Sequence, residues 1–169
     1  VSARKIPGQL RDMSDVSPSM FTPVSKIRNA RDVRALEDVP LEDRMVFDNV
    51  YQALAAAAEA DPDHPALSYI SDMDPATDPV TWSRADFFGR VTQAANLFHD
   101  TGLGPTDVVA FLLPALAETH VVLWGTETAA IAAPVNYLLT PETIADLLKA
   151  SKAKALVALG PHPAFDIWE

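Results

Sequence analysis

The chain has 169 residues, of which 49% are hydrophobic and 21% are charged, proportions typical of a globular domain that buries a core. It has no cysteine, which excludes disulfides and thiolate metal sites and fits a cytoplasmic location. Residues 46–169 hold five Lys or Arg and sixteen Asp or Glu, a net charge of −11 that disfavours a nucleic-acid partner. No apolar run reaches the roughly 20 residues that a membrane span needs.

Residues 1–45 predict an irregular arm, because periodic apolar positions are few and the segment contains Pro7, Pro18, Pro23 and Pro40. The remainder, residues 46–169, predicts an α/β domain. It opens with a helix over residues 46–60, for which Asp48 is the expected cap. Strands over residues 66–70 and 80–82 then predict a hairpin around an acidic loop.

The central part of the chain alternates between helix and strand. Ser83 and Asp86 have the spacing of a capping pair at the start of a helix, and Gly102 stands where such a helix ends in a left-handed residue. Apolar runs predict strands over residues 108–113, 131–135 and 155–159, with helices over 116–129 and 141–150 between them. This alternation predicts a parallel wound sheet flanked by helices.

The periodic apolar positions of these elements also predict the core. Its expected members are Phe87, Val91, Phe98, Val109, Phe111, Leu113, Val121, Leu123, Val135 and Leu147.

Several short motifs follow one another in a familiar order. Thr81 and Trp82 end a strand, GLGPTD (residues 102–107) follows a helix, and a buried strand ends at Pro114. Gly125 then lies in a helix, residues 130–136 read AIAAPVN, and Thr140-Pro141-Glu142 opens the next helix. In this order the motifs resemble the N-terminal region of AMP-binding, adenylate-forming acyl-CoA synthetases of the fatty-acyl type. The resemblance covers about residues 47–160 and implies the N-terminal subdomain of that fold.

The resemblance implies a parent enzyme that uses ATP, Mg²⁺ and coenzyme A to activate a small carboxylic acid. The family's phosphate loop and catalytic lysine have no counterpart here, so we expect a fragment truncated before the ATP-binding region, without cofactor and inactive alone. A truncated domain of this kind is also a candidate for self-association. The alternative interpretation is a self-contained α/β binding or interaction module that shares only the layer pattern.

The residues themselves indicate no catalytic or metal site. Asp61, Asp63 and His64 fit a turn that ends a helix better than a metal cluster. Asn136 and Tyr137 follow a strand, where α/β sheets place ligands, so they are candidate ligand-proximal residues, with a turn-stabilising role as the alternative for Asn136. Trp124 is a candidate for lining an acyl tunnel, with plain core packing as its alternative.

Overall fold

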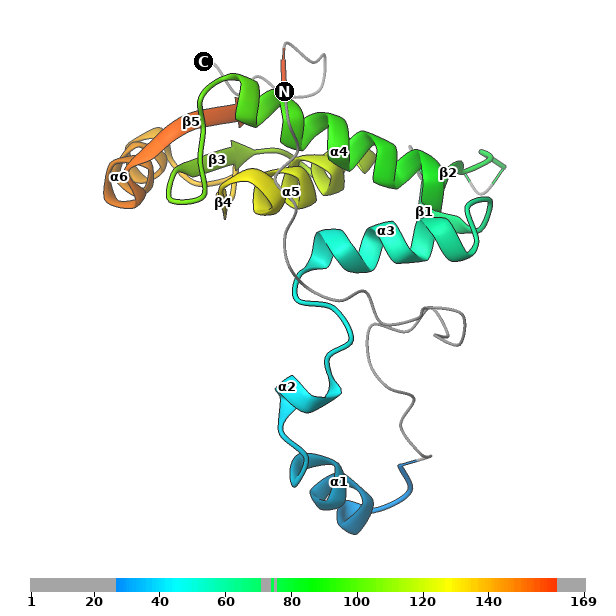
Figure 1. Cartoon of the computed structure of the whole chain (residues 1–169). Coiled ribbons are helices and arrows are strands. Elements are labelled where there is room, and N and C mark those ends of the chain that lie inside the picture. Colours follow the sequence, from blue (N-terminus) through cyan, green and yellow to red (C-terminus); the bar gives the residue numbers. More distant parts are fainter. Residues whose placement is uncertain (1–26, 71–73, 75, 161–169) are drawn as a thin grey trace, which may run out of the picture. The chain divides into compact units, whose positions relative to one another are not determined.

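The computed structural model describes residues 27–70, 74 and 76–160 (Figure 1). The chain divides into two compact units, Val1–Asp48 and Asn49–Glu169, whereas the sequence predicted the division after residue 45. Among the helices that the structure describes, none combines the length and the apolar character needed to cross a membrane.

The sequence had predicted an irregular arm over residues 1–45, but the described part of the first unit contains two helices. They are helix α1 (Ala30–Glu37) and the short helix α2 (Leu41–Arg44). Asn29 caps α1, because its Oδ1 accepts hydrogen bonds from the backbone N–H groups of Arg31 (2.9 Å) and Asp32 (3.2 Å). No residue of α1 is buried. The signal for this helix is therefore its cap residue, because the helix has no buried apolar face that a periodic pattern would reveal. Residues 1–26 of the predicted arm lie outside the described residues.

The second unit opens with helix α3 (Val50–Ala60), which begins later than the predicted residue 46. Asn49 is its cap rather than the expected Asp48, since Asn49 Oδ1 accepts the Gln52 N–H at 2.9 Å. Strands β1 (Pro65–Tyr69) and β2 (Val80–Ser83) then pair antiparallel, which confirms the predicted hairpin.

Helix α4 (Arg84–Asp100) has the predicted signals at both ends. Ser83 Oγ accepts the Asp86 N–H at 3.1 Å, and Gly102 adopts φ = 84°, a left-handed conformation that suits glycine. Strand β3 (Val108–Leu112) follows, and then helix α5 (Ala117–Ala129), strand β4 (Ile131–Pro134), helix α6 (Pro141–Ser151) and strand β5 (Ala153–Ala158).

The three later strands form one parallel sheet in the order β4-β3-β5. Only β3 has a neighbour on each side within the described residues, so β4 and β5 are edge strands. The sequence predicted a strand over residues 131–135, and the structure places the strand of that segment, β4, at an edge of the sheet. Ile131 is 46% exposed, because it lies at an edge of the sheet.

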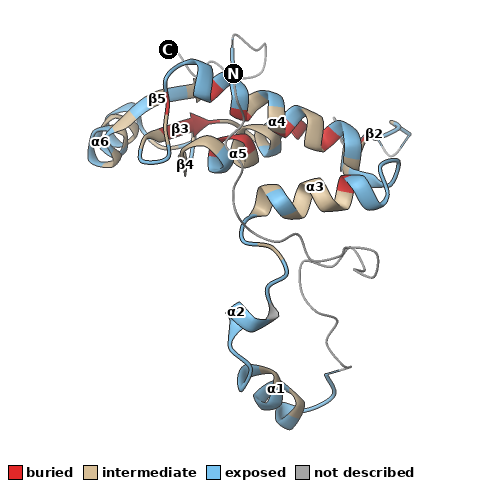
Figure 2. Cartoon of the chain, in the orientation of Figure 1, coloured by how far each residue is buried: buried red, intermediate tan, exposed pale blue. Residues whose placement is uncertain are grey.

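Two clusters of buried residues form the core, and they lie along α4, α5 and β3 (Figure 2). One joins α4 to the hairpin through Trp82, Phe87 and Val91, and the other joins α4 to the sheet through Phe98 and Val109. The expected core residues Phe87, Val91, Phe98, Val109 and Phe111 are buried.

Four other members of the predicted core, Leu113, Val121, Leu123 and Val135, are only partly buried, and one, Leu147, is exposed. Leu113 follows β3 and is only half-buried, whereas Leu112 within the strand is 4% exposed. Leu147 is 42% exposed, because α6 contacts the edge strand β5 and leaves this side chain toward solvent.

Helices α4 and α5 approach each other closely at Gly125. A methyl group placed on Gly125 would lie 2.6 Å from Ala94 Cβ and 3.2 Å from the Val91 carbonyl oxygen. Both distances are shorter than normal van der Waals contact, so the two backbones approach as closely as they do only because position 125 has no side chain.

We therefore expect Gly125→Ala to destabilise the second unit by about 1–3 kcal/mol through overpacking. Gly89→Ala is the matched control, because the same methyl group on α4 would meet no atom within 4 Å and alanine favours a helix interior. Urea unfolding followed by circular dichroism measures both. Equal stability of the two variants would contradict a packing role for Gly125.

Candidate functional site

The carboxyl edge of the sheet is where β3, β4 and β5 all end. In parallel sheets this edge carries the loops that hold ligands. The chain continues there from β3 into Pro114, from β4 into Asn136 and from β5 into Gly160. These turns define the candidate site.

Threonine fixes the turn between β3 and α5. The residue at the cap position of α5, Leu116, has no side-chain oxygen to satisfy the helix N-terminus. Thr119 replaces it, since its hydroxyl donates to the Pro114 carbonyl at 2.6 Å and accepts the Leu116 N–H at 3.4 Å. The start of α5 is thereby held at the carboxyl edge of the sheet.

Asn136 stabilises the turn that follows β4. Its Oδ1 accepts the Leu138 N–H at 3.0 Å, and its carbonyl accepts the Leu139 N–H at 3.3 Å. The turn-stabilising role considered from the sequence is therefore present. Asn136 is also exposed, and its amide nitrogen forms no hydrogen bond within the described residues, so that group can still reach a ligand.

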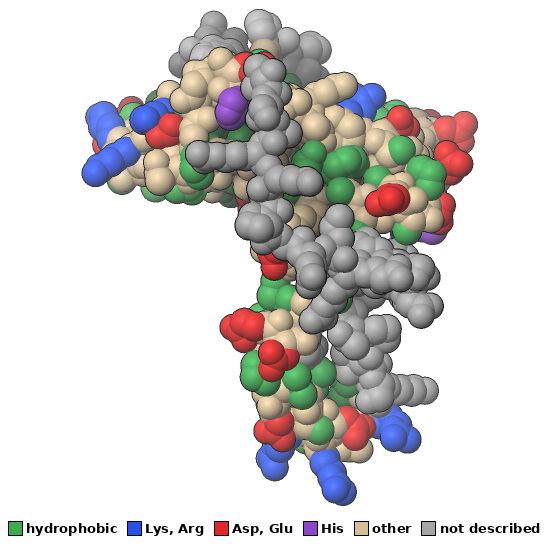
Figure 3. Space-filling view, viewed as in Figure 1, with side chains coloured by type: hydrophobic (Ala, Val, Ile, Leu, Met, Phe, Trp, Pro, Cys, Tyr) green, Lys and Arg blue, Asp and Glu red, His purple; other side chains and the backbone are tan. Residues whose placement is uncertain are grey.

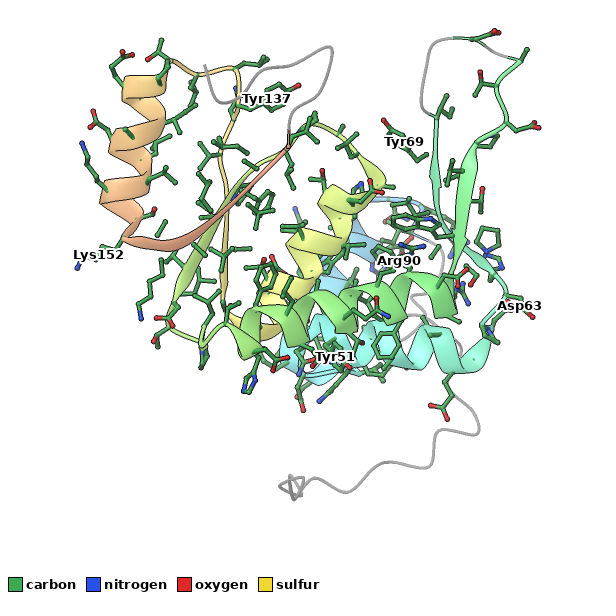
Figure 4. All side chains as sticks on the ribbon, turned by 90° about the horizontal axis from the view of Figure 1, so that it is seen from above. Tyr51, Asp63, Tyr69, Arg90, Tyr137 and Lys152 are labelled. Carbon is green, nitrogen blue, oxygen red and sulfur yellow. The ribbon has the colours of Figure 1, made fainter. Side chains whose placement is uncertain are left out.

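The three ligand-proximal candidates do not come together. Tyr137 is half-buried beside Asn136 at the carboxyl edge, and Figure 4 shows it at the opposite end of the strands from Lys152. Trp124 lies in the second half of α5, which runs back toward the amino edge where β4 begins. It packs against the cluster of Trp82, Phe87 and Val91.

The described turns of the carboxyl edge contain few groups that could act as an acid or a base. Its turn residues Pro114, Asn136 and Tyr137 include no acid or base that ionises near neutral pH. Among the described residues no group of three or more histidines and carboxylates could hold a metal ion. His64 Nδ1 lies 3.5 Å from Asp61 Oδ2 in the turn after α3, with both side chains more than half exposed. The turn residues Pro114, Asn136 and Tyr137 can therefore orient or line a ligand, but they do not form an acid–base pair.

The charged contact of the sheet lies at its amino edge. Asp107 Oδ1 pairs with Lys154 Nζ of β5 at 2.6 Å, while Asp107 Oδ2 accepts the Gly104 N–H at 3.0 Å. The Asp107 carbonyl also accepts the Ile131 N–H at the start of β4, at 2.8 Å. One residue thus joins the turn after α4 to both edge strands. The sequence did not predict this pair, because 47 positions separate its members.

These contacts change the ionisation of Asp107. The hydrogen bond from Lys154, then the one from the Gly104 N–H, hold the pKa of the Asp107 carboxyl below its usual value, although partial burial opposes them. The charge of Lys154 is in turn balanced by the Asp107 carboxylate.

Comparison with known proteins defines the class to which this arrangement belongs. Residues 54–167 match the family described as AMP-binding enzyme. The chain therefore belongs to that family, which confirms the resemblance seen in its motifs.

A curated relative supports this assignment. The marinolic acid–CoA ligase of Pseudoalteromonas sp. (strain SANK 73390) is 34% identical over 143 residues. The match covers 85% of this chain and 22% of the ligase, so the chain spans about a fifth of that relative's length.

Solved structures share the fold. The inhibitor-bound N-terminal domain of FACL13 from Mycobacterium tuberculosis matches with a TM-score of 0.57 and 25% identity, over 66% of this chain and 27% of that one. A Mycobacterium tuberculosis fatty acyl CoA synthetase gives the same score and identity, over 65% and 21% of the two chains. The Klebsiella oxytoca NpsA N-terminal subdomain with anthranilyl-AMSN also scores 0.57, at 20% identity over 69% and 29%. The predicted α/β fold, the N-terminal subdomain of adenylate-forming enzymes, is confirmed.

The lowered pKa of Asp107 predicts how stability depends on pH. A carboxyl whose pKa is lower in the folded state stabilises the fold above its unfolded pKa of about 4, and this contribution is lost as the pH falls through the folded value. We expect Asp107→Asn to lower the free energy of unfolding at pH 7, and the difference from the parent chain to shrink below about pH 4.

Urea titrations at several pH values between 3 and 7 measure this difference. Asp146→Asn is the control, since the Asp146–Lys149 pair spans 3.9 Å with both side chains about 80% exposed. A stability difference for Asp107→Asn that stays constant over this pH range would contradict the role assigned to its charge.

Proposed function

We propose that this chain forms the N-terminal part of an ATP-dependent acyl-CoA synthetase. The observation that carries the proposal is the match of residues 54–167 to AMP-binding enzymes. The 34% identical relative is a CoA ligase, and the fold matches N-terminal domains of enzymes of this kind. A parallel sheet with ligand-accessible turns at its carboxyl edge is consistent with such a role.

The proposed reaction has two half-reactions. A carboxylate oxygen attacks the α-phosphorus of ATP, which forms an acyl-adenylate and releases pyrophosphate. The sulfur of coenzyme A then attacks the acyl carbon, so a thioester forms and AMP departs as the thiol proton is lost. Mg²⁺ would offset the polyphosphate charge in the first step. A lack of cysteine fits a reducing compartment, and we place the enzyme in the cytoplasm.

We further propose that the acid substrate is of the fatty-acyl class. The support is the 25% identity to a Mycobacterium tuberculosis fatty acyl CoA synthetase. The turn after β4 fits an apolar acid better than a highly charged one, because Leu138 and Leu139 follow Asn136 and Tyr137 there and none of these four residues is charged.

Within this enzyme we assign the chain a scaffold role, inactive alone. Polyphosphate transfer needs converging cations or oriented N–H donors. The Lys and Arg side chains of the second unit are spread over three elements: Arg84 and Arg90 lie on α4, Lys149 and Lys152 lie on α6 and at its C-cap, and Lys154 lies on β5. Lys154 is paired with Asp107, and Arg90 lies 4.3 Å over the Trp82 ring. Figure 3 shows basic side chains at the α6 end of the unit and acidic ones at its hairpin end.

Residues 1–169 alone should therefore bind ATP-Mg²⁺ weakly and release no pyrophosphate with any fatty acid. The physical reasons are repulsion by the acidic second unit and the spread of its Lys and Arg side chains, which form no cationic clamp within the described residues. Isothermal calorimetry tests binding and a pyrophosphate-release assay tests turnover, with the longer protein expressed from the same gene as the positive control. Micromolar ATP binding by residues 1–169 would contradict the scaffold role, whereas an inactive longer protein would contradict the proposed enzyme.

We also propose that the isolated chain self-associates through the exposed apolar residues of its edge strands β4 and β5. Ile131 pairs with Val108, and Leu156 pairs with Ala110, so both lie on the same face; they are 46% and 42% exposed. Exposed apolar edge strands favour association.

Light scattering at rising concentration should give a mass above the 18.3 kDa of one chain at 0.15 M NaCl. Ile131→Lys should restore the monomer, and Leu97→Lys, which alters a 61% exposed residue of α4, should not. A monomer at every concentration would contradict the proposal.

A further inference from the structure

A pocket of about 350 Å³ lies between the first turn of α3 and the last turns of α5. Its lining residues are Asn49, Val50, Tyr51, Trp124, Glu127 and Thr128. Figure 4 shows Tyr51 far from Tyr137, so this pocket is separate from the carboxyl-edge site. The volume is at the lower end of the range for small-molecule sites.

Two aromatic side chains of the pocket are held in place by the fold. Tyr51 packs on Phe88 with ring centroids 5.0 Å apart, and its hydroxyl lies 3.1 Å from Thr92 Oγ1. Thr92 already donates to the Phe88 carbonyl, so the Tyr51 hydroxyl is the donor in this pair. Trp124 packs against the hairpin cluster. The aromatic surface is therefore largely formed before a ligand arrives.

The charge around the pocket is negative. Glu127 is exposed and forms no ion pair within the described part of the chain, and no Lys, Arg or His lines the pocket. The last turn of α5 adds the negative end of a helix dipole. The N-terminus of α3 carries the positive end of its helix dipole, but the Asn49 Oδ1 atom already accepts the Gln52 N–H there and offsets part of that charge.

We propose that this pocket binds an organic ammonium group. The cation would lie against the aromatic surface of Trp124 and Tyr51, with Glu127 as its counter-charge, because aromatic faces and carboxylates attract the same ligand. A neutral group of the same shape would gain only the apolar contact, so charge is the feature that the site recognises. This ligand class is independent of ATP, coenzyme A and the carboxylic acid.

Choline and 3,3-dimethylbutan-1-ol are suitable probes, since they have the same shape and differ in charge. The readout is the indole N–H resonance of Trp124 in NMR spectra of residues 1–169, assigned by its loss in Trp124→Phe. Choline should shift this resonance with saturation on the order of millimolar, and the alcohol should bind more weakly. Equal binding of both probes, or no saturable shift, would overturn the proposal.

Glu127→Gln and Glu118→Gln separate the counter-charge from the general acidity of the surface. Both alter exposed residues of α5, but only Glu127 lines the pocket. Glu127→Gln should weaken choline binding about two- to fivefold, while Glu118→Gln leaves it unchanged. Equal weakening by the two variants would show a non-specific field and overturn the assigned site. Circular dichroism verifies that each variant is folded.

Discussion

The contact between α4 and α5 at Gly125 is the constraint on which the rest of the second unit depends. This helix pair covers the hairpin through Phe87 and Val91 and the sheet through Phe98, so both parts share one layer. If the helices separated, both clusters would lose cover at once. The close packing also buries Thr126, whose hydroxyl has no partner among the described residues, which costs about 1–3 kcal/mol that the surrounding contacts must offset.

The direction of the strands separates structural from ligand-facing residues. At the amino edge Asp107 joins Lys154, Gly104 and the start of β4, so the charges there are used to hold strands together. At the carboxyl edge the turns are fixed by Thr119 and Asn136, which carry no charge. In the proposed enzyme the chain would thus shape one wall of a ligand site, and the cations that a polyphosphate requires would come from other parts of the protein.

The comparisons and the geometry both fit a chain that is one part of an AMP-binding enzyme. The family match and the shared fold place the chain among AMP-binding enzymes, while the chain spans 22% of the curated ligase. Ile131 and Leu156 on the edge strands β4 and β5 are exposed, so the described residues cover these two strands only in part. The pocket lined by Tyr51 and Trp124 lies away from the carboxyl edge of the sheet, so a ligand in the pocket need not compete with substrates of the carboxyl-edge site.

The sequence by itself determined the local elements and the family, because capping residues, Gly102 and apolar runs act over a few positions. It placed the hairpin, α4 and the alternation of strands and helices correctly, and its ordered motifs identified the AMP-binding enzymes. Only the tertiary structure decided the strand order β4-β3-β5, and with it the exposure of Ile131. It also decided the pairing of Asp107 with Lys154 and the placement of Tyr51 and Glu127 around one pocket. These contacts join residues far apart in the chain, and the pattern around either partner does not specify the other.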